Sequence, residues 1–134
     1  MVASLGYPRE HTVFEFIDAL AAKDKVKSLR FADEMMSDSS QALQTLSLMH
    51  RLFRQFLQMK ELSGKMSSGE MARQIGMYGV PPSVVERKVQ QSKHFSYSVL
   101  VTAIEQLGML DDRIKRSAID NNVFMEQLIQ GLTN

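Results

Sequence analysis

The sequence predicts an all-α protein, a single compact bundle of about seven helices. Only three prolines and seven glycines occur in 134 residues, and we expect none of them inside a strong helical pattern. β-branched residues nowhere alternate with polar ones over the length of a strand. Apolar residues make up 44% of the chain, which is ordinary for a globular protein of one domain.

Composition excludes several classes of protein and site. The chain has no cysteine, so it holds neither a disulfide scaffold nor a zinc–thiolate site. No apolar run approaches the roughly 20 residues that span a bilayer. Residues 1–11 include Gly6 and Pro8 but lack the apolar core of a signal peptide, so we expect a linker or the remnant of an upstream domain. These features favour a cytoplasmic protein with no membrane partner.

Residues 12–134 are expected to form the helical domain. Thr12 and Glu15 have the spacing of a capping box, which predicts that the first helix begins at Thr12. Asp24 is a good N-cap for a second helix over Lys25–Met36. The stripe of that helix that should be buried comprises Val26, Leu29, Ala32 and Met36.

The longest helix is expected over Gln41–Leu62, with Ser40 as its cap. Apolar residues lie on two of its sides, which is typical of a central helix in a bundle. One side carries Leu43, Leu46, Phe53 and Leu57, and the other carries Leu48, Leu52, Phe56 and Met59.

Caps and breakers predict four further helices. Ser67 and Glu70 form a capping box for a short helix that ends at Gly76. Pro82 suits the first position of the next helix, which should end near residues 94–95. Ser96 caps a long helix to about Ala118. A last helix opens at Asn121 or Asn122.

The sequence shows no motif typical of a catalytic, cofactor-binding or metal-binding site. The three histidines, His11, His50 and His94, are too far apart in sequence to suggest a metal site. The glycines form no phosphate-binding loop, and no serine has a convincing partner base. We therefore expect no catalytic activity, no cofactor and no metal.

The helix that begins at Pro82 carries a modestly basic face. Arg87, Gln91 and His94 share this face, Lys88 and Lys93 flank it, and Tyr97 follows. Lysine and arginine neutralise phosphates, and tyrosine can stack on an unpaired base. These six residues are candidates for facing DNA; the alternative is a solvated helix surface.

The segment EMARQIGM, residues 70–77, allows another interpretation. Ala72 and Gly76 have the spacing found in the first helix and turn of a helix-turn-helix. The following loop is longer than the usual three or four residues. A small DNA-binding regulator and an unrelated helical adaptor therefore remain alternatives at this point.

Several segments, taken in order, resemble a known family. VFEFIDALAAKD (13–24) and KSLRFADEM (27–35) look like its first helical pair, and FRQFLQMKEL (53–62) looks like its long second-pair helix. EMARQIGM, the two prolines and VVERKVQQSKHFSYSVLVTAIEQL (84–107) are similar to its A-x-x-L-G…P…V…FS…L region. VFMEQLIQGL (123–132) is similar to its closing helix. The family is the C-terminal collar of the bacterial DNA polymerase III delta subunit, which is part of the clamp loader.

This resemblance implies an assembly role. Collar domains of that family pack side by side, so the expected partners are the delta-prime and gamma/tau motor subunits. The sliding clamp would be contacted by an N-terminal domain missing here, and primer–template DNA could lie near the collar. The parent complex is the DNA polymerase III holoenzyme, a DNA-directed DNA polymerase, but the resemblance implies no catalysis by this domain.

Overall fold

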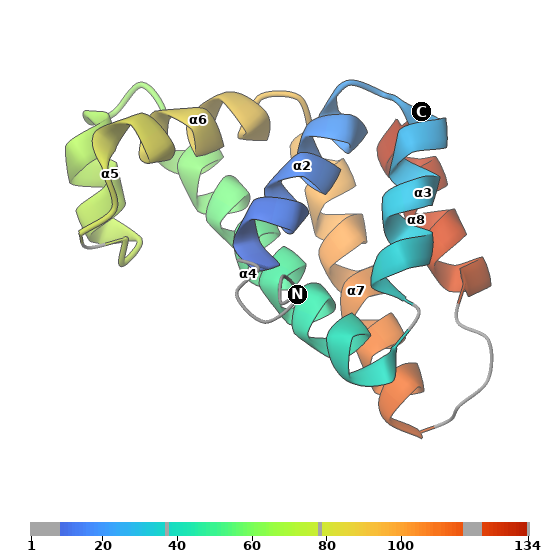
Figure 1. The fold of residues 1–134 in the computed structure, drawn as a ribbon. Helices are drawn as coiled ribbons and strands as arrows, with labels where there is room; N and C mark the ends of the chain where they lie inside the picture. The colour runs from blue at the N-terminus through green and yellow to red at the C-terminus, as the bar shows by residue number, and fades with distance from the viewer. Residues whose placement is uncertain (1–8, 37, 78, 117–121, 134) are drawn as a thin grey trace.

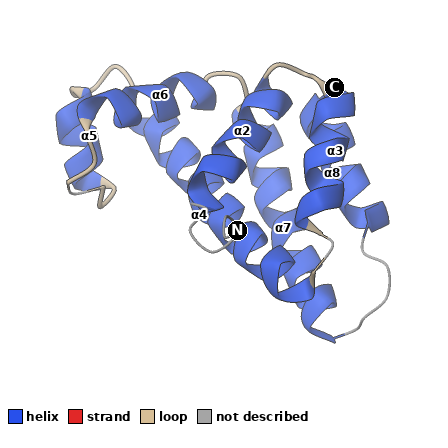
Figure 2. Ribbon diagram, in the orientation of Figure 1, coloured by secondary structure: helices blue, strands red, loops and turns tan. Residues whose placement is uncertain are grey.

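The computed structural model describes residues 9–36, 38–77, 79–116 and 122–133, and all regular structure in this part of the chain is helical (Figure 2). The seven described helices are α2 (Arg9–Ala21), α3 (Lys25–Met35), α4 (Ser39–Leu62), α5 (Ser68–Gln74), α6 (Pro82–Ser92), α7 (Tyr97–Arg116) and α8 (Asn122–Thr133). The predicted all-α bundle is confirmed.

The two longest helices, α4 and α7, form the centre of the bundle. They pack side by side, and α4 also contacts α2, α3 and α6 (Figure 1). α3 and α8 pair along one flank, whereas α5 and α6 extend from the opposite flank (Figure 1). The prediction of a central helix over 41–62 is therefore correct.

An aromatic cluster lies where α4 meets the turn between α6 and α7. The ring of Phe53 lies 5.9 Å from those of both Phe56 and Phe95, measured between centroids. The Phe56 and Phe95 rings stack at 6.3 Å. All three side chains are at most 1% exposed. Such pairs contribute about 0.5–1.5 kcal/mol each beyond their buried area, so the cluster holds the α6–α7 turn against α4.

Side-chain caps define most helix starts, although two predicted caps are wrong. Asp24 caps α3 as predicted, accepting from the backbone N–H of Lys27 at 3.1 Å. Asp38, not Ser40, caps α4, because its carboxylate accepts from two backbone N–H groups. Thr12 lies inside α2, which begins at Arg9, so its predicted capping role is wrong.

For the later helices, the predicted boundaries agree more closely with those of the structure. Ser67 caps α5, Pro82 opens α6 and Ser96 accepts from the N–H of Val99 at the start of α7. α6 ends at Ser92, slightly earlier than predicted. α7 is described to Arg116, so its predicted end near 118 falls outside the described residues. Of the two predicted starts of the last helix, 121 also falls outside them, and α8 begins at the other, Asn122.

The predicted inward stripe of α3 is partly wrong. Ala32 is buried, but Val26 is 70% exposed and Leu29 is 37% exposed. Ser28 and Met35 take the inward positions instead, and the Ser28 hydroxyl donates to the Asp24 carbonyl at 2.7 Å. α3 is therefore rotated relative to the prediction, so that part of its apolar stripe faces away from the core.

Asp18 joins α2 to α6. One carboxylate oxygen accepts from Arg87 Nη2 and the other from Gln91 Nε2, each at 2.6 Å. The Gln91 side chain is buried at 4% exposure, whereas Arg87 and Asp18 are about half exposed. Since both oxygens of one carboxylate are used by adjacent turns of α6, this pair of contacts, the α2–α6 clasp, sets how α6 lies on α2.

Gly108 should be replaceable with a gain in stability. It lies inside α7, and Gly69 and Gly131 lie inside α5 and α8, so the expectation of glycine-free helices is wrong at all three. A Cβ at Gly108 would meet no atom within 4 Å. Gly108→Ala should raise the free energy of unfolding by about 0.5–1 kcal/mol in urea titrations. Gly76→Ala is the control: φ there is +82°, so alanine should destabilise.

Removing the Asp18 carboxylate should weaken the attachment of α6. Asp18→Ala leaves the buried Gln91 amide without its acceptor, which costs about 1–3 kcal/mol in the free energy of unfolding. The matched control is Asp112→Ala, which removes an exposed i,i+4 pair with Arg116 and should cost at most about 0.5 kcal/mol. Equal effects in urea unfolding would contradict the role of the clasp.

Candidate interaction surfaces

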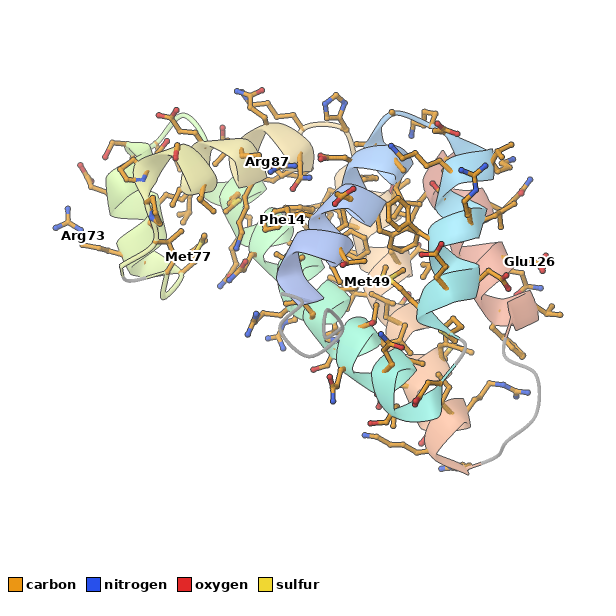
Figure 3. All side chains as sticks on the ribbon, viewed as in Figure 1. Phe14, Met49, Arg73, Met77, Arg87 and Glu126 are labelled. Carbon is orange, nitrogen blue, oxygen red and sulfur yellow. The ribbon has the colours of Figure 1, made fainter. Side chains whose placement is uncertain are left out.

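The structure divides the six candidate DNA-facing residues into two groups. Arg87, Lys88 and Gln91 point from α6 toward α2, whereas Lys93, His94 and Tyr97 lie exposed at the α6–α7 turn. Arg87 lies above Phe14 of α2 (Figure 3), with its guanidinium carbon 5.3 Å from the ring centroid. The sequence interpretation placed Arg87, Gln91 and His94 on one face with the other three beside it, whereas in the structure Arg87 and Gln91 engage Asp18 and His94 lies at the α6–α7 turn.

Lys88 lies in the junction between α2, α4 and α6. The residue is 7% exposed, and its ammonium lies 5.3 Å from the Phe14 ring centroid and 3.5 Å from Gln55 Oε1. Burying an ammonium is costly unless polar and aromatic groups surround it. Lys88 thus contributes to packing in the monomer, as does Gln91 through Asp18.

The exposed group borders a shallow hollow of about 350 Å³ at the end of the bundle. Its lining residues are Lys60, Glu61, Ser63, Ser92, Lys93 and Tyr97. Tyr97 is 54% exposed at the first position of α7, and Lys93 and His94 are also exposed. We call Lys60, Lys93, His94 and Tyr97 the basic corner. It combines two ammonium groups with an accessible aromatic ring, which suits a phosphate backbone with unpaired bases.

The geometry of α5 and α6 does not favour a helix-turn-helix. α5 has seven residues, and residues 75–81 separate it from α6, a connection longer than that motif uses. The face of α6 that holds Lys88 and Gln91 is occupied by α2. Gly76 adopts the left-handed conformation that is common just after a helix C-terminus. Its presence is therefore explained by the end of α5 and does not require a DNA-binding turn.

A second surface, which the sequence interpretation missed, follows the seam between α3 and α8. Five large apolar residues are conspicuously exposed in the described part of the chain, and three of them lie on these two helices: Val26, Leu29 and Val123. A hollow of about 400 Å³ is lined by Val26, Leu29, Arg30, Ala32, Asp33, Met125 and Glu126. We call these lining residues the α3–α8 seam. Exposed apolar groups within a polar rim are characteristic of protein–protein contacts.

A connection from Lys23 to the end of α8 positions this seam. Lys23 Nζ donates to the carbonyl of Leu132 at 3.1 Å, which ties the α2–α3 turn to the last turn of α8. Lys23 has a φ of 61°, an uncommon left-handed conformation for a residue other than glycine. The start of α3 therefore lies beside the end of α8, and the two helices run antiparallel (Figure 1).

A metal site and a membrane span each have requirements that the described residues do not meet. Within them, no group of three or more histidine, cysteine or acidic side chains is placed to hold a metal ion. Among the described helices, none has the length and apolar character needed to cross a membrane.

Comparisons with known proteins agree with one another. A family model described as DNA polymerase III delta subunit, C-terminal domain, matches residues 10–132. The chain is 25% identical over 118 residues to the DNA polymerase III subunit delta of Bacillus subtilis (strain 168), covering 87% of this chain and 33% of that protein. It thus spans about a third of the length of this curated relative.

The solved structure of the Bacillus subtilis DNA clamp loader delta protein has a similar fold. Its TM-score is 0.77 at 22% identity, over 94% of this chain and 37% of that chain. At this identity the likeness supports the fold alone. The family model, in contrast, covers nearly the whole chain, from residue 10 to residue 132. The chain therefore belongs to the family formed by the C-terminal domains of DNA polymerase III delta subunits.

Proposed function

We propose that this domain anchors its protein in a bacterial clamp loader by packing against the corresponding domains of delta-prime and the gamma/tau motor subunits. The observation that carries the proposal is the α3–α8 seam, where Val26 and Leu29 are exposed beside Arg30, Asp33 and Glu126. Apolar side chains of this size favour burial by about 1.5–3 kcal/mol each, so a surface that gathers them favours a protein partner. Membership in the delta family supports another member of the clamp loader as that partner.

In this proposal the domain performs no catalytic step. Contact with the sliding clamp and loading onto primed DNA would depend on other parts of the complete protein and on its partners, in the cytoplasm. The polymerase activity would belong to the DNA polymerase III holoenzyme. Because the chain belongs to the delta family, it is not an adaptor unrelated to the clamp loader, and a small DNA-binding regulator is not favoured either.

The assembly role predicts the outcome of a reconstitution. The complete protein, mixed with delta-prime and the motor protein of the same organism, should elute as one complex in size-exclusion chromatography with light scattering. A version lacking residues 9–133 should not enter the complex, because its anchoring surface is gone. If the truncated version assembled as well as the complete protein, the proposed function would be wrong.

A second candidate function is contact with primer–template DNA through the basic corner. The observation that favours it is the accessible group of Lys93, His94 and Tyr97 beside Lys60. Arg87, Lys88 and Gln91 would then act indirectly, by holding α6 against α2. DNA contact by any of the six sequence candidates stays a prediction.

Substitutions in the basic corner test this contact. Lys93→Ala in the assembled loader should weaken binding to primed DNA and lower the slope of log affinity against log salt by about 0.7–0.9. Tyr97→Ala should cost about 1–3 kcal/mol of binding if the ring stacks on a base. Arg73→Ala is the control, because Arg73 is an exposed cation on α5, away from the corner (Figure 3). Unchanged affinity and salt slope in the first two variants would exclude the contact.

A further inference from the structure

We propose that the α3–α8 seam receives a single helix of a neighbouring protein in the clamp loader, and that the charges of the seam set the direction of that helix. The proposal deepens the proposed function and rests on it. It assigns the partner an aliphatic ridge, with acidic side chains toward the start of α3 and basic side chains toward the start of α8.

The shape of the seam suits a helix. α3 and α8 lie side by side and antiparallel (Figure 1), and the hollow follows α3 over about two turns and is closed on its other side by one turn of α8. Val26, Leu29 and Asp33 line it from α3 at intervals of three and four residues, and Met125 and Glu126 line it from α8. A ridge of side chains on a partner helix fits such a groove.

The charges along the seam are separated by sign. Lys27 and Arg30 are exposed in the first two turns of α3, and Asp33 follows in its last turns. Glu126 extends outward from α8 (Figure 3) and lines the same hollow as Asp33. Because the helices are antiparallel, both carboxylates lie toward one end of the seam, and Arg30, the cation that lines the hollow, lies about one turn of α3 closer to the other end.

These charges are available to a partner. Throughout the described ranges, Arg30, Asp33 and Glu126 engage in no ion pair with one another or with a neighbouring helix. The i,i+4 pairs of α7, in contrast, are satisfied within their own helix. A seam with Arg30 toward the start of α3 and Asp33 and Glu126 toward its end attracts a helix with the reverse order of charges and repels one lying the other way.

The same pattern argues against other occupants. A phosphate backbone would be repelled by Asp33 and Glu126, and an anionic bilayer surface would be repelled for the same reason. The exposed apolar residues, Val26 and Leu29, lie toward the start of α3, on the Arg30 side of the hollow, and a protein partner would cover them. A helix with an aliphatic ridge and charges of both signs satisfies the apolar and the charged groups of the seam.

The experiment uses the complete protein with delta-prime and the motor protein. Val26→Ser combined with Leu29→Ser should weaken assembly at least 10-fold, with helix content by circular dichroism unchanged. Val26 is 70% exposed and Leu29 is 37% exposed, so neither side chain belongs to the buried core. The matched control is Met109→Ser, which alters a 61% exposed apolar residue on α7 and should leave assembly unchanged.

Exchanging charges tests the direction of the partner helix. The double variant Arg30→Asp with Asp33→Arg keeps the composition of α3 but reverses the order of sign along the seam. It should weaken assembly about 10-fold at low salt and by less at high salt, because screening removes the difference.

The outcomes separate the two proposals. If the unaltered complete protein fails to assemble, the proposed function fails. If it assembles and both seam variants assemble equally well, the function stands and the seam assignment is overturned. If the complete protein alone dimerises and the seam variants abolish that dimer, the occupant is a second copy and the proposed partner is wrong.

Discussion

The packing of α4 is the constraint on which the rest of the structure depends. This helix contacts α2, α3, α6 and α7, and its Phe53 and Phe56 surround the ring of Phe95. Because Phe95 belongs to the turn between α6 and α7, burying it fixes where one helix ends and the next begins. Both surfaces are connected to this arrangement: the basic corner lies beside the Phe95 turn, and Lys23, whose ammonium lies 6.0 Å from the Phe95 ring centroid, bonds to the end of α8 beside the α3–α8 seam.

The polar side chains of α6 show how packing changes the meaning of a sequence pattern. A helical projection places Arg87 and Gln91 on one face with His94, which suggests one ligand-binding surface. In the folded chain, Asp18 engages the first two, and Lys88 is buried against Phe14. The buried amide and ammonium are tolerated because α2 supplies an acceptor and an aromatic face. Arg87 stays about half exposed while it pairs with Asp18, and the other accessible candidates lie at the end of the helix, beside the α6–α7 turn.

The α3–α8 seam has a different origin. α3 is amphipathic in sequence, but α2, α4 and α8 cover only part of its circumference, and the rotation that buries Ser28 leaves Val26 outside. The Lys23 contact with Leu132 then holds α8 along the other side of the seam. Exposed apolar side chains next to charged groups that form no ion pair on neighbouring helices suit a domain that binds other proteins. That is the role proposed for this member of the delta family.

Local interactions in the sequence determined the helical class, the central position of α4 and most helix starts. Caps such as Asp24 and Ser67 involve residues three positions apart, so their signal is contained in a short segment. Only the tertiary structure decided which side of α3 is buried and which cations of α6 stay accessible. A periodic pattern defines an apolar stripe but not its partner, and the partners of Lys88 lie on α2 and α4, far away in sequence. The buried side of α3 and the accessibility of the α6 cations depend on how whole helices pack against one another, and no spacing within a short segment encodes that packing.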